Sequence, residues 1–174
     1  VTDGGGQTPN VDAFDPTGAP VYTFTSSMIR EAAYASLPES SLPMVHRLTA
    51  AWLERHGVCD PLVLASHWRH SDTPERAVTW LTTAAEAALA GHDYEGALFH
   101  VADALNLEPD DTVRARLHTM AAEAHEWTGD ERARQNEAHH GLALSTPGSP
   151  VWFRAFRQGL VAGARQHGAE AVER

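Results

Sequence analysis

The sequence lacks lysine altogether, and all 13 of its basic side chains are arginine. Reactions that need a lysine amine, such as Schiff-base formation, are therefore excluded. The phosphate-binding motif GxxxxGK followed by Ser or Thr is excluded as well, because its lysine contacts the phosphates. Since the nucleophile motif GxSxG is also absent, the sequence predicts a chain that neither hydrolyses ATP nor acts as an enzyme.

Cysteine is almost absent too. The single cysteine, Cys59, cannot form an internal disulfide, which is typical of proteins in a reducing cytoplasm. Cys59 lies beside an expected helix start with no base next to it in sequence, so we interpret it as a small apolar packing residue. The sequence therefore predicts a cytoplasmic location.

Positive charge and long apolar runs are also in short supply. The sequence has 13 basic and 23 acidic side chains. The resulting net charge of -10 repels a nucleic-acid backbone. No run of about 18 uncharged apolar residues occurs, so no membrane-spanning segment is expected. The chain begins at Val1 rather than at Met, which we interpret as the start of a piece of a longer protein.

The stretch from Thr73 to Pro109 shows the most regular pattern, that of two antiparallel amphipathic helices. We expect Thr73 to cap the first helix, Pro74 to occupy its first turn, and Gly91 to adopt a left-handed conformation after its end. The apolar stripes comprise Ala77, Leu81, Ala84 and Ala88 in the first helix and Ala97, Val101, Ala104 and Leu105 in the second. Their alanines allow the two helices to approach closely.

Capping residues and apolar periodicity predict further helices along the chain. They cover residues 26–37, 41–56, 61–70, 111–127 and 130–144, and a last helix begins at Ser149 and Pro150. Before them, residues 1–20 are rich in Gly, Pro and Asp and are expected to form a flexible linker or loop, with a short strand at 21–24. We divide the chain into this linker, a lead-in segment with one helix at 21–40, and helical repeats at 41–174.

The predicted helices repeat at an interval of 36 residues. Three positions of one helical face align in four copies: Val45, Leu81, Leu117 and Phe153; Leu48, Ala84, Met120 and Phe156; Trp52, Ala88, Ala124 and Leu160. The second helices align Ala65 with Val101 and Glu137, and Trp68 with Ala104 and His140, so their third copy loses its apolar register. Stacked hairpins of this length predict an all-α fold of about seven to eight helices, arranged as a right-handed α-α superhelix.

Two resemblances extend this interpretation. Ala85, Ala97, Ala104 and Pro109, within the run that ends DYEGALFHVADALNLEP, resemble the tetratricopeptide pattern, which implies a tetratricopeptide-like solenoid. More widely, residues 22–109, with YTFTSSMIREAAYASLP, MVHRLTAAWLE and LASHWRHSDTPERAVTWLTTAAEAA, are similar to the segment that follows the ATPase module in large bacterial signal-transducing regulators with LuxR-type, kinase or cyclase partners. This resemblance implies a sensor or scaffold segment whose parent carries the nucleotide site and any DNA-binding module elsewhere.

The 11 histidines raise the question of a metal site. His67 and His70 are three residues apart on an expected helix, as are Glu137 and His140, and this spacing puts two ligands on one face. A carboxylate-bridged di-metal bundle needs two Glu-x-x-His pairs, however, and HExxH is absent. We therefore expect no metal and no other cofactor.

Two sets of residues are candidates for an interaction surface. The first is expected to flank the buried stripe of the first helices and line a concave groove: Thr82, Thr83, Glu86, His118, Thr119 and Glu123. The second lies on the last helix, where a repeat array has no following unit to cover it: Trp152, Phe153 and Phe156. Such aromatic residues at helical spacing are also typical of ordinary packing between helices.

These observations support two hypotheses of function. The first is a noncatalytic module of a transcriptional or signalling regulator that binds a protein, a peptide or another domain of its own chain, without direct contact to nucleic acid or membrane. Self-association into a homodimer through the last helix is a further expectation under it. The alternative is a domain that senses a small molecule in a deep apolar cavity between its helices and controls the ATPase of its parent.

Overall fold

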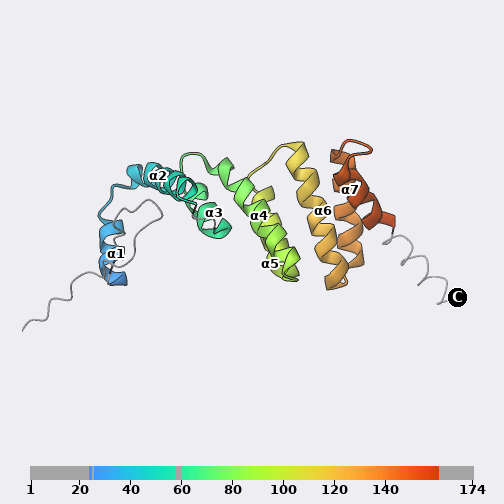
Figure 1. Ribbon diagram of the computed structural model, residues 1–174, viewed down its shortest axis with the longest axis horizontal. Helices are drawn as coiled ribbons and strands as arrows, with labels where there is room; N and C mark the ends of the chain where they lie inside the picture. The colour runs from blue at the N-terminus through green and yellow to red at the C-terminus, as the bar shows by residue number, and fades with distance from the viewer. Residues whose placement is uncertain (1–23, 25, 58–59, 161–174) are drawn as a thin grey trace, which may run out of the picture.

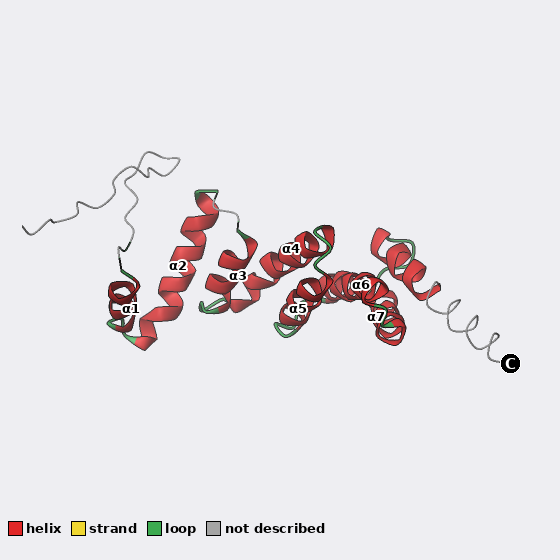
Figure 2. Ribbon diagram, turned by 90° about the horizontal axis from the view of Figure 1, so that it is seen from below, coloured by secondary structure: helices red, strands yellow, loops and turns green. Residues whose placement is uncertain are grey.

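The computed structural model describes residues 24, 26–57 and 60–160, and these residues form helices joined by short loops, without a strand (Figures 1 and 2). The helices are α1 (Ser27–Ala35), α2 (Leu42–Arg55), α3 (Pro61–Arg69), α4 (Ala77–Ala90), α5 (Tyr94–Leu105), α6 (Asp111–Thr128) and α7 (Glu131–Leu144), with short 3-10 turns at Glu39–Ser41 and Pro74–Arg76. Residues 150–160 are also helical. The all-α fold and the expected number of helices are confirmed.

Some of the sequence predictions concern residues outside the described ranges. They include the linker at residues 1–20, Cys59 and most of the strand expected at 21–24. Of that strand only Phe24 is described, and it is exposed and not part of a strand.

The helices form a row in which neighbours in sequence are neighbours in space (Figure 1). Each helix from α2 to α7 packs against the next, and α4 also contacts α6, so that the hairpins α2–α3, α4–α5 and α6–α7 stack on one another. Helix α1 has no buried residue and extends from one end of the row. The stacking agrees with the predicted repeats, whereas the right-handed superhelical path stays a prediction.

The core runs through the row from α2 to α6. Its members are mostly small or aliphatic: Ala50, Ala65, Trp68, Ala77, Leu81, Ala85, Val101, Ala104, Leu117, Met120 and Ala121. Both stripes predicted for the hairpin at 73–109 contribute to it, because their alanines let the helix axes approach and bury the larger side chains between them.

Four aspartates cap helix starts. Asp60, Asp93, Asp110 and Asp130 each accept a hydrogen bond from a backbone amide in the first turn of the following helix. The predicted cap at Thr73 is wrong. A 3-10 turn separates Thr73 from α4, and the Thr73 backbone amide and hydroxyl instead bond to the Ser71 hydroxyl at 3.1 and 3.3 Å.

The left-handed residue predicted at Gly91 is also displaced. Gly91 has a φ of -83° and continues the right-handed path, with its amide bonded to the Ala87 carbonyl. The reversal occurs one residue later, at His92, where φ is 63°. Gly129 does take the left-handed conformation at the end of α6, with a φ of 80°.

The repeat interval lengthens along the chain instead of holding at 36. Buried Leu81 and Leu117 are 36 residues apart, but buried Val101 is followed by buried Ala138 after 37, and Leu117 by buried Ala155 after 38. The reason is that α6 and α7 have 18 and 14 residues, against 14 and 12 in α4 and α5. Helix α7, the second helix of the third hairpin, therefore keeps a buried face, contrary to the prediction. Phe153 does not occupy the position that corresponds to Leu117.

At the N-terminal end of the row, the residues of α2 are more exposed than the residues that align with them in α4 and α6. Leu48 is 54% exposed and Trp52 is also exposed, whereas Ala84 and Met120 are buried. The difference arises because the inner helices have a preceding hairpin against this face and α2 has none within the described residues.

Candidate interaction surfaces

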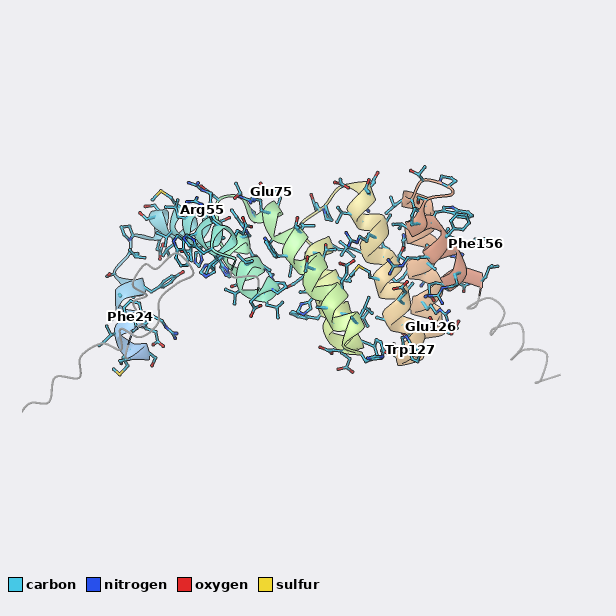
Figure 3. The ribbon with its side chains drawn as sticks, in the orientation of Figure 1. Phe24, Arg55, Glu75, Glu126, Trp127 and Phe156 are labelled. Atoms are coloured by element: carbon cyan, nitrogen blue, oxygen red, sulfur yellow. The ribbon has the colours of Figure 1, made fainter. Side chains whose placement is uncertain are left out.

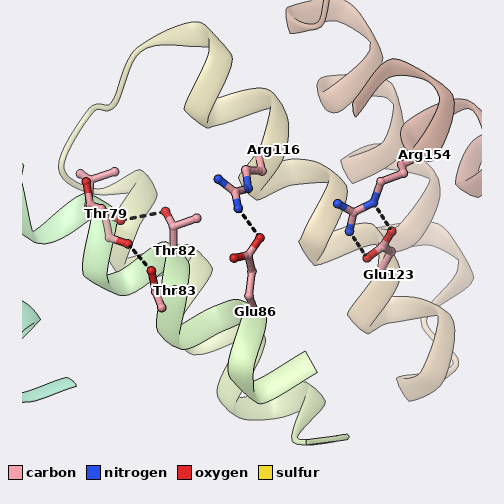
Figure 4. Close-up of polar contacts among 8 residues, drawn as sticks. Thr79, Thr82, Thr83, Glu86, Arg116, Glu123 and Arg154 are labelled. Atoms are coloured by element: carbon pink, nitrogen blue, oxygen red, sulfur yellow. Dashed lines mark hydrogen bonds and ion pairs between the residues drawn. The ribbon is translucent and has the colours of Figure 1, made fainter. Parts of the chain in front are cut away.

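Consecutive first helices are joined by a series of glutamates. Glu86 of α4 pairs with Arg116 of α6, and Glu123 of α6 pairs with Arg154 through two hydrogen bonds of 3.0 and 2.7 Å (Figure 4). The hydrogen bonds to Glu123 raise the pKa of the Arg154 guanidinium above its usual value. Glu54 of α2 links α2 to the start of α4 in a similar way, through hydrogen bonds.

Glu54 binds three donors at once. Its Oε1 accepts hydrogen bonds from the indole N–H groups of Trp68 and Trp80 at 2.7 and 2.9 Å, and its Oε2 accepts one from Arg76 at 3.1 Å. The Arg76 guanidinium also lies over the Trp68 ring, 3.6 Å from its centroid. A glutamate on the first helix of each hairpin therefore binds the first helix of the next one: α2 to α4, α4 to α6, and α6 to the helix at 150–160.

Two residues predicted to line a groove are buried, and the prediction is wrong for Thr119, whereas Thr82 still lines a small hollow of about 130 Å³ together with Thr83. Thr82 is 5% exposed and donates to the Val78 carbonyl, while Thr119 is 1% exposed and donates to the Ala115 carbonyl (Figure 4 shows Thr82). Both hydroxyls are satisfied within their own helices. They are covered because this face of the first helices packs against the neighbouring helices.

The other predicted groove residues are at least partly accessible, but most have partners. Glu86 and Glu123 bind the arginines described above, and Nδ1 of His118 lies 2.7 Å from Oε2 of Glu137. Only Thr83 among the six predicted residues is classed as exposed, and its hydroxyl donates to the Thr79 carbonyl at 3.0 Å. Glu86, His118 and Glu123 are therefore engaged in ion pairs between helices, while Thr82 and Thr83 line a small hollow beside Arg116.

The last described helix carries an aromatic cluster. The Trp152 and Phe156 rings stack with centroids 5.0 Å apart, and Phe153 meets Trp152 edge to face at 5.1 Å. Phe153 is 58% exposed, Phe156 and Leu160 are exposed as well, and Trp152 is half-buried. Figure 3 shows Phe156 at this end of the row. We call Trp152, Phe153, Phe156 and Leu160 the aromatic edge.

The same helix is anchored on its opposite side. Ala155 and Gln158 are buried, and Oε1 of Gln158 accepts a hydrogen bond from the Arg134 side chain at 2.9 Å. The aromatic edge is thus held in a fixed orientation by a well-packed helix.

A hollow of about 490 Å³ lies between α3 and α5. Its lining is mixed: Leu62, Ala65, Ser66, Arg69, His70, Leu81, Phe99, His100 and Asp103. Arg69 and Asp103 form an ion pair of 2.6 Å there. The charged lining differs from the deep apolar cavity that the sensing hypothesis predicts.

A cluster of imidazoles that the sequence did not reveal lies between α2 and α3, and Tyr34 of α1 reaches it with its hydroxyl. It comprises His46, His67 and His70, which we call the histidine cluster, and Tyr34 hydrogen-bonds to it. The sequence shows the spacing of His67 and His70, whereas His46 joins them only when α2 folds back on α3. Across the described residues, no group of three or more His, Cys, Asp or Glu side chains is placed to hold a metal ion.

Comparison with protein-family models, with curated proteins and with solved structures finds no match to this chain. The resemblance to bacterial signal-transducing regulators therefore stays a prediction from the sequence. Each helix within the described ranges falls short of the length or the apolar character that crossing a bilayer demands.

Proposed function

We propose that this chain is a noncatalytic interaction module that binds a protein helix through the aromatic edge. The observation that carries the proposal is the exposure of Phe153, Phe156 and Leu160 on a helix whose other side is firmly packed. Contiguous exposed apolar side chains are typical of protein-binding surfaces, and fixed aromatic rings lose little conformational entropy on binding. The edge therefore offers apolar area in a preformed shape.

A helical partner follows from the packing of the preceding unit. By the 38-residue interval, Phe153 and Phe156 correspond to Ala115 and His118 of α6. That side of α6 is covered by α7, where Gly141 approaches Ala115 and Thr119 closely. An amphipathic helix laid antiparallel to residues 150–160 would bury the aromatic edge in the same way.

The source of that helix is another domain of the same parent chain, a separate protein or a second copy of this chain. The resemblance to signal-transducing ATPase regulators favours the first two, within a cytoplasmic regulator of transcription or signalling. The net charge of -10 disfavours direct contact with nucleic acid and also opposes close self-association.

Site-specific photo-crosslinking tests the proposal. A photoreactive phenylalanine analogue replaces Phe153 in the full-length parent within cells, and the matched control carries it at Phe99, which is exposed on α5. We expect a discrete crosslinked product at position 153, weakened by Phe156→Asp, whose peptide map gives an amphipathic helix. Crosslinking no stronger than at position 99, or unchanged by Phe156→Asp, would contradict the proposal.

The alternative, a sensing domain, draws on the hollow between α3 and α5. Its volume of about 490 Å³ lies in the range of small-molecule sites, and Phe99 and Leu62 offer apolar contact beside Arg69 and His100. Under this alternative a small-molecule library raises the melting temperature and Phe99→Asp abolishes the effect. Under the interaction proposal, Phe99→Asp leaves the crosslink at position 153 intact.

A further inference from the structure

A continuous chain of hydrogen bonds links α1 to α3 through the histidine cluster. Nε2 of His46 lies 2.8 Å from the Tyr34 hydroxyl, and Nδ1 of His46 lies 3.0 Å from Nδ1 of His67. The ring of His70 also packs against His46, with centroids 5.3 Å apart, and its Nδ1 donates to the Ser66 carbonyl at 2.8 Å. His46 of α2 is therefore the centre of the cluster.

The contact between two ring nitrogens limits how many protons the cluster holds. A hydrogen bond between Nδ1 of His46 and Nδ1 of His67 contains one proton, which one nitrogen donates and the other accepts. Because an imidazolium carries protons on both nitrogens, the pair accommodates one protonated ring and not two. A second proton would set two N–H groups against each other at 3.0 Å.

The charged groups next to the cluster do not offset additional protons. Arg47 pairs with Asp72 at 2.9 Å, and Arg69 pairs with Asp103 at 2.6 Å. Among the described residues, no carboxylate forms an ion pair with an imidazole of the cluster. From α1 the neighbouring group is the Tyr34 hydroxyl, which hydrogen-bonds to His46.

Burial and mutual repulsion both act against protonation. Burial lowers the pKa of His46, and the positive charges of His67 and His70 lower it further. Burial likewise lowers the pKa of His67, with a further contribution from His70. The folded arrangement thus favours neutral rings.

We propose that the histidine cluster is a pH-operated catch that holds α2 against α3, and tethers α1 to α2 through Tyr34, at neutral pH and releases both as its rings take up protons in acid. Protonation of both His46 and His67 breaks the bond between them and places two cations side by side. Helix α2 then separates from α3 at this end, and Tyr34 loses its link to the row. Because α1 has no buried residue and packs against no other helix of the described residues, little else within them retains it. The proposal is independent of the aromatic edge.

Hydrogen exchange of the whole chain tests the catch. Exchange is followed by mass spectrometry at about pH 7.5 and about pH 5.5, on either side of the ordinary histidine pKa, and is corrected for intrinsic rates. We expect protection in α1 and α2 to fall about tenfold more than in α6 on acidification, since one extra proton taken up on opening shifts the equilibrium by up to tenfold per pH unit. A uniform change along the chain would overturn the proposal.

Three variants separate the catch from general acid sensitivity. His67→Gln keeps a polar side chain but removes one titrating ring, so the excess loss of protection in α1 and α2 should disappear. Tyr34→Phe should loosen α1 at both pH values while α2 keeps its dependence on pH. His139→Gln, at an exposed position of α7, should behave as the wild type. An unchanged pH dependence in His67→Gln would overturn the proposal.

A direct titration keeps the test decisive if His67→Gln fails to fold. In NMR spectra of the wild-type chain, the ring signals of His46 and His67 should titrate below the ordinary histidine pKa of about 6.5, and the two should show coupled curves. Independent curves centred at that ordinary value would contradict the catch.

Discussion

Arg134 is fully buried although it carries a charge. Its side chain is 0% exposed, and three groups surround it: Gln158 at 2.9 Å, Glu126 at 3.4 Å and Glu131 at 3.5 Å. The two glutamate distances are those of ion pairs rather than of short hydrogen bonds. Arg134 therefore connects α6, α7 and the helix at 150–160 through charge as much as through packing.

Removing this arginine should destabilise the chain strongly. We expect Arg134→Ala to lower the free energy of unfolding by roughly 3–5 kcal/mol, because it leaves a cavity and a partly buried carboxylate at Glu126 without its cation. Urea unfolding monitored by circular dichroism measures the change. Arg132→Ala, at an exposed position of the same helix, should change it by less than about 0.5 kcal/mol. Equal effects of the two substitutions would contradict the assigned role of Arg134.

The candidate groove residues could be predicted only in part, because their exposure depends on the partners of their side chains. Thr82 and Thr119 have polar side chains at the right helical phase for a groove, yet their hydroxyls bond to carbonyls one turn earlier and both residues are almost fully buried. Glu86 and Glu123 were predicted to line a groove, but each binds an arginine that lies 30 or 31 residues away. Such pairs depend on the relative position of two helices, which residue spacing alone does not specify.

Close approach between α6 and α7 depends on a helical glycine. A Cβ at Gly141 would lie 2.8 Å from the Thr119 hydroxyl oxygen and 3.3 Å from the Ala155 Cβ. Gly159 also lies in a helix, but a Cβ there would meet only the Ala138 Cβ at 3.8 Å, which is an ordinary contact. The two glycines thus make a matched pair for measuring packing.

We expect Gly141→Ala to destabilise the chain by about 1–3 kcal/mol, because overpacking outweighs the better helix propensity of alanine. Gly159→Ala should be neutral or stabilising by up to about 1 kcal/mol. Thermal and urea unfolding of both variants provide the measurement. Thr119→Ala should relieve much of the cost of Gly141→Ala, since it removes the nearest atom. The interpretation fails if Gly141→Ala is as stable as Gly159→Ala.

The elements themselves were largely predictable. Aspartate caps and glycine or proline at helix ends place the observed boundaries within a few residues, because these signals act through the local backbone. The fixed interval of 36 residues was wrong after α6 because the third hairpin has longer helices. An apolar pattern that includes buried Arg134 and Gly141 also looks polar or neutral in sequence, although both face the core.

At the scale of the whole molecule, the all-α fold followed from helical periodicity, whereas the candidate sites followed only in part. The aromatic edge was predictable because its residues recur at helical spacing on the last described helix, where Phe153, Phe156 and Leu160 are exposed. The histidine cluster was not, because His46 and His67 meet across a hairpin and Tyr34 comes from a third helix. Contacts between elements depend on loop geometry as well as on residue pattern.

The histidine cluster also predicts how the stability of the whole chain depends on pH. The pKa values of His46 and His67 are lowered in the folded chain, so between those values and the ordinary one of about 6.5 the unfolded state binds more protons than the folded state. The stabilisation associated with neutral rings is therefore complete above about pH 6.5, and it is lost progressively as the pH falls from there toward the folded-state pKa values.

Urea unfolding at several values between about pH 7.5 and about pH 5 measures this dependence. We expect the free energy of unfolding to decrease with falling pH in the wild type and in His139→Gln. The double variant His46→Gln/His67→Gln should show a shallower slope, because it lacks both rings whose pKa is lowered. A double variant with the wild-type slope would assign the acid sensitivity to other groups, and a wild type that gains stability on acidification would show that the folded chain favours the protonated cluster.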